Sequence, residues 1–464
     1  MKLTIVHPCV GKLPGEPYIR AWQMEPLPAA HLAGLTPKDV EIRFVDDRLE
    51  PIDFDEPTDL VAMSVETYTA RRSYQIASAF RRRNVPVVMG GFHPTLVPEE
   101  VSQYADATVC GEAENSWPQL IRDFQAGRMQ RIYRAAARPD IAKASPDRSI
   151  FAGKRYLPLH LIEAGRGCTF KCDFCVIQKY FDSTQNLRSI ETIVEEIKRL
   201  PHRNRLMFFV DDNMVSHPEH TKLLCEALIP LKIRWVSQAT ITLAHDAELV
   251  RLLKASGCEG VLIGFESLNR ENLRQMNKSF GGARGGPAAA IAKLHAAGIR
   301  IYGTFIFGYD HDTLQSFEET LSFCIDQKLF IVAFNHLTPF PGTPLYQRLQ
   351  AEGRLLFDKW WLDSEYRYGM IPFQTTLPPA EITRRCSEAR QKFYSLSSIM
   401  RRFNNPAHWR GSKMIFPYFF INLILRSDAD VRYRYPLGDP QFTEPLLPAG
   451  HEIGLLRAQA GTCS

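Results

Sequence analysis

The sequence has no long hydrophobic run. Its longest apolar stretch, residues 414–425, has only about half the length that a helix needs to cross a bilayer. The apolar run at the N-terminus is too short for the hydrophobic region of a signal peptide. We therefore expect a cytoplasmic protein that is neither exported nor membrane-spanning.

An excess of charge of one sign is also lacking. The 56 Lys and Arg against 51 Asp and Glu leave a net charge of +5 over 464 residues, which is too small for a dedicated nucleic-acid surface. The 45% hydrophobic and 23% charged content is that of a globular protein. At roughly 150 residues a domain, the length predicts about three domains and no nucleic-acid partner.

Short apolar runs alternate with helical patterns in the first part of the chain. They lie at residues 3–7, 40–45, 60–65, 85–89 and 107–110. Continuous rather than alternating hydrophobicity is typical of parallel strands covered on both faces. The pattern predicts an α/β domain over residues 1–130 with a doubly wound, Rossmann-like parallel sheet, followed by a linker over residues 131–157.

A second series of strands and helices is expected over residues 158–355. Its six strand candidates lie at residues 160–164, 206–210, 233–239, 260–265, 300–307 and 331–337. Ser189 is a suitable N-cap for the first helix between them. The pattern predicts a partial parallel (β/α)6 barrel, and residues 356–464 predict a small, mainly helical C-terminal unit with one long helix at 379–403.

Three of the ten cysteines crowd together and seven are scattered singly. Cys168, Cys172 and Cys175 follow the first predicted barrel strand with the spacing C-x3-C-x2-C. Clustered thiols in a reducing compartment indicate metal ligands or redox groups, and three thiolates on one loop leave one iron of an iron–sulfur cube without a protein ligand. A structural zinc site, which normally has four ligands, is the alternative, and a disulfide is less favoured.

With Phe174 before its last cysteine, this motif resembles that of the radical S-adenosylmethionine (SAM) superfamily, over roughly residues 155–350. The resemblance implies that Cys168, Cys172 and Cys175 hold a 4Fe–4S cluster whose free iron chelates the amino and carboxylate groups of SAM. It further implies that one electron, from a donor such as flavodoxin or ferredoxin, cleaves SAM to methionine and a 5′-deoxyadenosyl radical.

Polar residues at other strand ends fit the same chemistry. Asp211 and Asp212 follow the second strand, where the equivalent family motif holds the SAM ammonium, and an ordinary helix N-cap is the alternative. Gln238 ends the third strand and Glu266 follows the fourth. They are interpreted either as hydrogen-bond partners of the SAM ribose or carboxylate region, or as ordinary polar residues of the barrel mouth. With Phe174, these are the predicted SAM-binding residues.

Ligands of open α/β sheets bind outside the C-terminal strand ends. The first strand lacks a dinucleotide fingerprint G-x-G-x-x-G. Instead, Gly-Gly-x-His-Pro-Thr at 90–95 and Gly-Glu-x-Glu at 111–114 resemble the cobalamin-binding domain of the cobalamin-dependent radical SAM subclass. The resemblance implies that cobalamin is lined by Ser64, Glu66, Thr67, Gly90, Gly91, His93, Gly111 and Glu112. The motif D-x-H-x-x-G is missing, so cobalt is expected to lack a protein imidazole ligand; a domain that packs on the barrel without ligand is the alternative.

Together these features predict a cobalamin-dependent radical SAM enzyme. The leading hypothesis is a methyltransferase that moves a methyl group from methylcobalamin to an unactivated carbon of a small or lipophilic metabolite, through the 5′-deoxyadenosyl radical. The nearest alternative is an oxidative cyclase or rearrangement enzyme without methyl transfer. A tRNA methylthiotransferase would need three cysteines in the N-terminal domain, where only Cys9 and Cys110 are present, and a non-enzymatic cobalamin-binding protein is less favoured still.

Residues 379–425 combine a cationic helix with an aromatic run. One interpretation is core packing of the C-terminal unit. The other is an entry for a lipid, polyketide or tetrapyrrole-like substrate at a membrane surface, and hence a peripheral membrane contact. No catalytic residue around the substrate is assigned.

Overall fold

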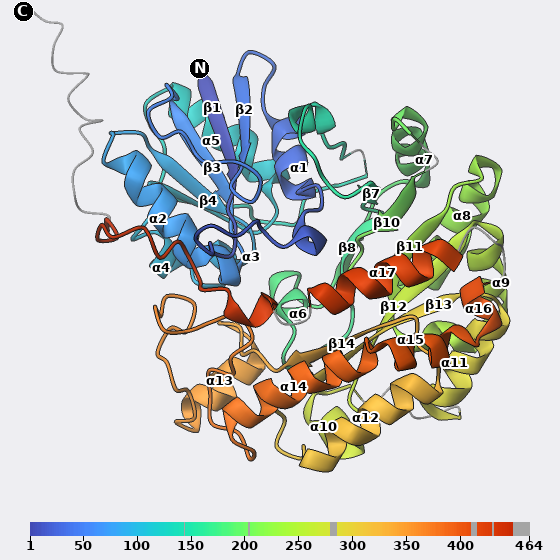
Figure 1. The fold of residues 1–464 in the computed structure, drawn as a ribbon. Helices are drawn as coiled ribbons and strands as arrows, with labels where there is room; N and C mark the ends of the chain where they lie inside the picture. The colour runs from blue at the N-terminus through green and yellow to red at the C-terminus, as the bar shows by residue number, and fades with distance from the viewer. Residues whose placement is uncertain (143, 203–204, 279–284, 410–414, 429–430, 449–464) are drawn as a thin grey trace, which may run out of the picture. The chain divides into compact units, whose positions relative to one another are not determined.

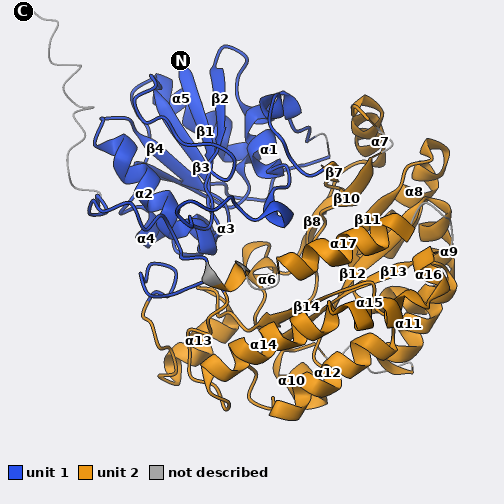
Figure 2. Cartoon of the chain, viewed as in Figure 1, with its two compact units in different colours: residues 1–157, 359–368, 435–464 blue, residues 158–358, 369–434 orange. Residues whose placement is uncertain are grey.

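The computed structural model describes residues 1–464 except 143, 203–204, 279–284, 410–414, 429–430 and 449–464 (Figure 1). The chain forms two compact units (Figure 2). Unit 1 contains residues 1–157, 359–368 and 435–464, and unit 2 contains residues 158–358 and 369–434. The functional division into a cobalamin-binding domain, a linker, a barrel and an accessory region stays a prediction.

Unit 1 is built on a six-stranded parallel sheet with the order β2-β1-β3-β4-β5-β6. Its central strands are buried on both faces, since Leu60, Val61, Val87 and Met89 are all inaccessible to solvent, which explains the continuous hydrophobic runs. The strands are β1 (Lys2–His7), β2 (Glu41–Asp46), β3 (Leu60–Ser64), β4 (Val87–Gly90), β5 (Ala107–Cys110) and β6 (Ile132–Arg134). The predicted doubly wound sheet is confirmed.

Strand β6 lies in the stretch that we expected to be only a linker. It has three residues, of which Ile132 and Arg134 are exposed and only Tyr133 is buried, so it gives no hydrophobic run. The longer helices of unit 1 are α1 (Leu27–Leu35), α2 (Ala70–Arg81) and α5 (Ala113–Gln125), with the short α3 (Phe92–Leu96) and α4 (Pro98–Val101). Because β1 has β2 on one side and β3 on the other, the strand order reverses there, and ligands of such sheets bind at the C-terminal strand ends near this point.

Unit 2 contains a second six-stranded parallel sheet, whose strands lie side by side in chain order. They are β7 (Leu159–Ile162), β10 (Leu206–Phe209), β11 (Trp235–Ala239), β12 (Cys258–Glu266), β13 (Arg300–Phe307) and β14 (Ile331–His336). Between them lie α7 (Ile190–Arg199), α8 (Pro218–Leu228), α9 (Ala247–Ala255), α10 (Arg270–Gln275), α11 (Gly286–Ala296) and α12 (Leu314–Asp326). Ser189 caps α7 by accepting a hydrogen bond from the Thr192 N–H. The predicted partial barrel is confirmed.

Five further helices follow the last strand in the described part of unit 2. They are α13 (Pro344–Ala351), α14 (Pro379–Phe393), α15 (Leu396–Phe403), α16 (Pro406–Trp409) and α17 (Ile415–Ser427). The expectation of one helix over 379–403 is wrong, because Ser395 is extended and caps a new helix by accepting from the Ser398 N–H. In the described part of the chain, no helix is both long and apolar enough to cross a membrane.

Candidate active site

The loop with the three clustered cysteines lies between two short paired strands. Strand β8 (Gly165–Gly167) pairs antiparallel with β9 (Gln185–Leu187), and the loop leads from β8 to α6 (Val176–Tyr180), with Cys175 as the N-cap residue. Gly167 has a φ of 97°, and a Cβ there would collide with the Thr184 carbonyl oxygen. A glycine is therefore required where β8 leads into the cysteine loop.

The three thiols are close enough to influence one another. Cys172 is buried, Cys168 and Cys175 are half-buried, and none forms a disulfide. Burial, with the neighbouring thiols as a smaller contribution, raises the pKa of Cys172 to about 12 and that of Cys175 to about 11. In the described residues no three His, Cys, Asp or Glu side chains are arranged around a single metal ion. The donor set, three thiols on one loop, fits a cluster that binds each thiolate at a different iron and releases the thiol protons.

Asp173 fixes this loop to two other parts of unit 2. The Tyr309 hydroxyl donates to Asp173 Oδ1 at 2.6 Å, and Arg348 Nη2 lies 3.7 Å from Oδ2. The Asp173 backbone N–H donates to the Met276 carbonyl, and its carbonyl accepts from the Leu345 N–H. Sequence reasoning missed these partners, since each lies more than a hundred residues further along the chain.

Asn213 and Ser216 donate weak hydrogen bonds to Cys168. Asn213 Nδ2 lies 3.7 Å and Ser216 Oγ 3.9 Å from Cys168 Sγ. Asn213 Oδ1 accepts from the Thr240 N–H, which holds the amide in place. Donors to a ligand sulfur tune the cluster that it binds, so both residues join the candidate site, although the sequence analysis did not select them.

Asp211 and Asp212 connect the end of β10 to the short segment that precedes the cysteines. Asp211 Oδ2 accepts from the Ala164 N–H at 3.0 Å, and Asp212 Oδ2 accepts from the Gly167 N–H at 2.7 Å. Burial, reinforced by the charges of Glu163 and Asp212, raises the pKa of Asp211 to about 8. Neither aspartate is an N-cap, since the following helical turn begins after Asn213.

Glu266 ends β12 in a left-handed conformation with a φ of 63°. Its Oε1 lies 2.5 Å from Lys278 Nζ, and both side chains are almost fully buried. Both charges affect the pKa of Cys172, so the pair lies close to the cysteine loop. Lys278 was not predicted, because it follows a helix and no strand end points to it. Gln238 and Phe174 are half-buried, on β11 and in the cysteine loop respectively.

In unit 1, the predicted cobalamin residues lie at the C-terminal edge of the sheet. Ser64 and Gly90 end β3 and β4, and Gly111 follows β5. A Cβ on Gly91 would lie 3.0 Å from Ser64 Oγ, whereas a Cβ on Gly111 would meet nothing within 4 Å. Gly111 therefore borders open space at this edge, which fits a bulky ligand such as the predicted group.

The other predicted residues of this edge differ in exposure. Glu66 is exposed, and its N–H donates to Thr69 Oγ1. Glu112 Oε2 accepts from Arg138 Nε at 2.6 Å, and the Glu112 side chain is almost buried. Thr67 and His93 are buried and contact each other, since Thr67 Oγ1 lies 3.3 Å from His93 Nδ1. The role of these residues in binding cobalamin stays a prediction.

Glu100 connects His93 to a distant segment of the same unit. Its carboxylate accepts from Tyr74 Oη and Trp361 Nε1, each at 2.9 Å, and lies 3.1 Å from Lys359 Nζ. His93 Nε2 is 3.2 Å away from it. Since a carboxylate only accepts, Nε2 carries the proton and Nδ1 accepts from Thr67. Both ring nitrogens of His93 are therefore used inside the protein.

Three half-buried aromatic rings gather in unit 1. The ring centroids of Tyr68 and Tyr368 lie 4.9 Å apart, and those of Trp22 and Tyr368 lie 5.1 Å apart. Tyr68 lies two residues after Glu66, which belongs to the sheet edge described above. Neither these rings nor Glu100 was selected from the sequence. The segment at 359–368, which supplies their partners, carries no motif.

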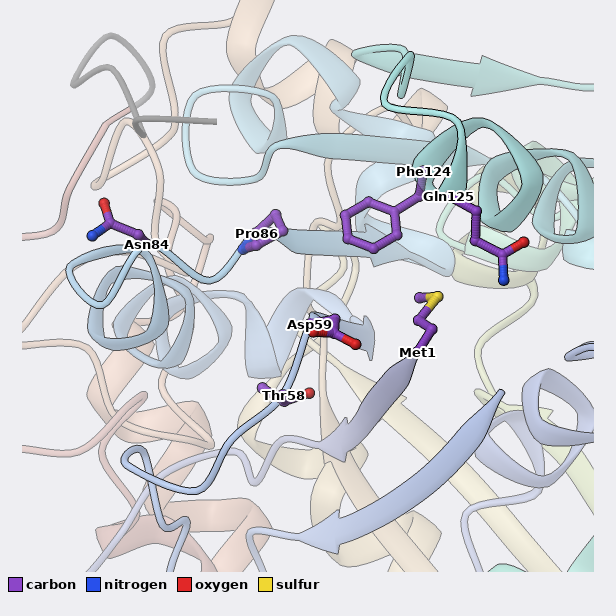
Figure 3. A pocket seen from close by; sticks show the side chains of 7 residues that line it. All are labelled: Met1, Thr58, Asp59, Asn84, Pro86, Phe124 and Gln125. Atoms are coloured by element: carbon purple, nitrogen blue, oxygen red, sulfur yellow. The ribbon is translucent and has the colours of Figure 1, made fainter. Parts of the chain in front are cut away.

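A separate pocket of unit 1 lies at the opposite end of the sheet. Its walls include residues just before β1, β3 and β4, namely Met1, Asp59 and Pro86, together with Phe124 and Gln125 of α5 (Figure 3). Since ligands of parallel α/β sheets bind at the C-terminal strand ends, we assign no function to this pocket.

The chain is similar to known proteins. The family model described as the radical SAM superfamily matches residues 162–324, and a domain of unknown function, DUF4070, matches residues 343–413. Bacteriochlorophyllide d C-12(1)-methyltransferase of Chlorobaculum tepidum is 30% identical over 397 residues, which cover 83% of this chain and 86% of the relative. The C-8(2)-methyltransferase of the same organism is 30% identical over 353 residues, which cover 71% of this chain and 77% of the relative.

A solved structure has the same fold. It is the radical S-adenosylmethionine methyltransferase TsrM from Kitasatospora setae, determined with cobalamin and a 4Fe–4S cluster bound. The TM-score is 0.61 at 17% identity, over 76% of this chain and 78% of that chain.

Proposed function

This chain belongs to the cobalamin-dependent branch of the radical SAM superfamily, and we propose that it methylates an unactivated carbon of a tetrapyrrole-like or similarly lipophilic metabolite. It is an enzyme, and carbon methylation is the activity that its relatives favour. The observation that carries the proposal is the cysteine loop at the end of the first barrel strands, on a chain that also contains an open-edged sheet in unit 1.

The cofactors are a 4Fe–4S cluster, SAM and cobalamin. When bound, the cluster supplies the electron that cleaves SAM, and cobalamin supplies the methyl group. Cys168, Cys172 and Cys175 hold the cluster, while Asp173 keeps their loop against Tyr309. Asn213 and Ser216 orient the Cys168 sulfur by donating to it.

The residues around the cysteine loop suit the charges of SAM. Asp212 is half-buried and close enough to Cys175 to affect its pKa, so it is placed to bind the SAM ammonium. Lys278 stays charged because Glu266 offsets the effect of its burial on the pKa, and the pair presents both a donor and an acceptor. Asp211, Gln238 and Phe174 complete the proposed set.

Ser64, Glu66, Gly90, Gly91, Gly111 and Glu112 are the proposed contacts of cobalamin in unit 1. Thr67 and His93 support the Gly90–Gly91 turn from inside, since both are buried and bonded to each other. Both nitrogens of His93 are used by Thr67 and Glu100, which supports the expectation that this histidine does not ligate cobalt.

An electron donor such as flavodoxin or ferredoxin and a peripheral membrane contact are also part of the proposal. A reducing protein is required because SAM cleavage consumes one electron. A membrane contact would bring the enzyme to a lipophilic substrate.

The test is an anaerobic assay of the reconstituted enzyme with SAM, hydroxocobalamin, a reductant and a chlorophyllide as substrate. We expect a product heavier by one CH2 group, together with 5′-deoxyadenosine and S-adenosylhomocysteine. The triple variant Cys168→Ala, Cys172→Ala, Cys175→Ala should form none of these, whereas Cys324→Ala, which removes a buried thiol of α12, should retain activity. A cyclised or rearranged product without a new methyl group would contradict the proposal and support the cyclase alternative.

A further inference from the structure

Helix α17 has two polar side chains on the inside. Tyr418 and Asn422, one helical turn apart, are inaccessible to solvent. The Tyr418 hydroxyl donates to the Ile399 carbonyl at 2.7 Å, and Asn422 Oδ1 accepts from the buried Arg402 at 3.0 Å. These hydrogen bonds anchor α17 to α15, and they leave the opposite side of the helix to be covered by something else.

That opposite side is apolar and exposed. Phe416, Phe420 and Leu423 are 72%, 52% and 46% exposed. Their spacing of four and three residues places them in one stripe along the helix, and the rings of Phe416 and Phe420 stack with centroids 5.5 Å apart. A helix in water normally shows the reverse arrangement, with its apolar side towards the core. We call these three residues the α17 stripe.

The sequence that leads into the α17 stripe is cationic. Residues 389–427 contain seven Lys or Arg and no Asp or Glu, and Asp428 and Asp430 follow them. Arg390 and Arg402 are buried, but Arg426 is exposed at the end of α17. Lys392 and Arg401 are also exposed and pair with acidic residues of α12. An apolar stripe flanked by positive charge is complementary to a bilayer surface with anionic headgroups.

We propose that α17 lies in the surface of an anionic lipid bilayer, with the α17 stripe among the acyl chains and Arg426 at the headgroups. At 13 residues the helix is about 20 Å long and too short to span a bilayer, so it lies on the membrane. The consequence that the enzyme meets its lipophilic substrate there rests on the proposed function, whereas the docking rests on α17 alone.

A second copy of the chain is the rival occupant of the α17 stripe, and two observations disfavour it. Three side chains on one short helix offer far less than the roughly 800 Å² per partner of a stable interface. In a two-fold symmetric dimer, the same cationic segments of both copies would also be brought together, and like charges repel.

The test is flotation of the purified enzyme with vesicles of phosphatidylcholine, with and without phosphatidylglycerol. We expect wild-type enzyme to float with the anionic vesicles and at least tenfold less with phosphatidylcholine alone. The triple variant Phe416→Ser, Phe420→Ser, Leu423→Ser should lose at least tenfold in binding. The matched control, Leu223→Ser, Leu314→Ser, Leu356→Ser, removes three other exposed leucines of unit 2 and should float like wild type.

Two further measurements keep the result interpretable. Circular dichroism and SAM cleavage in detergent should be unchanged in the α17 variant, because its substituted side chains lie outside the candidate active site. Failure of wild type to float with anionic vesicles would overturn the proposal, as would a wild-type dimer in sedimentation that the α17 variant abolishes. A failed methylation assay together with flotation that depends on the α17 stripe would remove the proposed function and leave the docking supported.

Discussion

The Tyr309 hydroxyl donates a 2.6 Å hydrogen bond to Asp173 Oδ1. Tyr309 follows β13, and Asp173 stands between the second and third clustered cysteines. The loop of a barrel strand far along the chain is thereby joined to the loop that holds the three thiols. Without this bond, Asp173 itself would be held by Arg348 and by its two backbone hydrogen bonds.

Tyr309→Phe should therefore loosen the cysteine loop. A hydrogen bond to a charged group contributes about 1.5–3 kcal/mol, and about 1.4 kcal/mol corresponds to a tenfold change in rate. We expect lower iron content after reconstitution and SAM cleavage slower by roughly tenfold. The control is Tyr133→Phe, which removes a comparable tyrosine–aspartate hydrogen bond, to Asp123 in unit 1. Equal iron content and rates in both variants would contradict the assignment.

Glu100→Gln should destabilise unit 1 more at neutral pH than in acid. Burial alone would raise the pKa of Glu100, but hydrogen bonds from His93, Trp361 and Lys359 outweigh it and hold the pKa at about 2, below the ordinary 4.5. The stabilisation is complete above pH 4.5 and is lost as the pH falls towards 2. At about 1.4 kcal/mol per pH unit it amounts to roughly 3 kcal/mol.

The measurement is denaturant unfolding at pH 7 and pH 3. The variant should be less stable than wild type at pH 7, with a smaller difference at pH 3. Glu99→Gln, which changes the exposed neighbour of Glu100, should match wild type at both. A deficit of Glu100→Gln that is the same at both pH values would show that the charge of Glu100 does not stabilise the fold.

Gly264→Ala should weaken SAM binding. A Cβ at position 264 would collide with Glu266 Oε1 and come within 2.8 Å of Lys278 Nζ, so the ion pair must move from its position. We expect a SAM dissociation constant raised about tenfold, equivalent to about 1.4 kcal/mol, with unchanged iron content. Glu266→Gln removes the charge without the collision and should act in the same direction. Normal SAM affinity in both variants would place the pair outside the SAM site.

Asp211→Asn should make the ligand-free protein less sensitive to alkaline pH. Burial raises the pKa of Asp211 to about 8, with Glu163 and Asp212 adding to the effect. The folded protein thus holds a proton that the unfolded chain releases near pH 4, and stability falls as the pH rises from about 4 to 8. The asparagine oxygen still accepts from the Ala164 N–H.

Urea unfolding at pH 5.5 and pH 8 measures this effect. The gain in stability of Asp211→Asn over wild type should be larger at pH 8. Asp182→Asn, at an exposed position of unit 2, should show no such difference. A variant that is less stable than wild type at pH 8 would mean that Asp211 is ionised in the folded protein.

The strands of both sheets could be predicted because burial on both faces gives continuous hydrophobic runs. The strand at 300–307 was predicted with the bounds that β13 has, and the runs at 60–65 and 107–110 coincide closely with β3 and β5. The cysteine loop could be predicted because its three ligands are adjacent in sequence and follow a strand.

Contacts between distant residues could not be predicted in this way. Tyr309 and Asp173 are separated by 136 positions, and Trp361 and Glu100 by 261, so no local spacing connects either pair. Lys278 is only twelve positions from Glu266, but it follows a helix rather than a strand end, so no strand pattern indicated it. The interruption at Ser395 was missed because the residues on both sides have helical patterns, and a single serine is compatible with a helix.

Unit 1 is completed last during synthesis of the chain, because it includes residues 359–368 and 435–464. A nascent chain that has left the ribosome as far as residue 157 still lacks Lys359 and Trp361, two donors to Glu100, and it also lacks the stretch around Asp439, whose backbone bonds Gln75. The N-terminal sheet therefore lacks some of its hydrogen-bond partners until the whole second unit has been translated. A gene fragment that ends after the barrel would encode a protein with an unfinished first unit, however well its second unit folds.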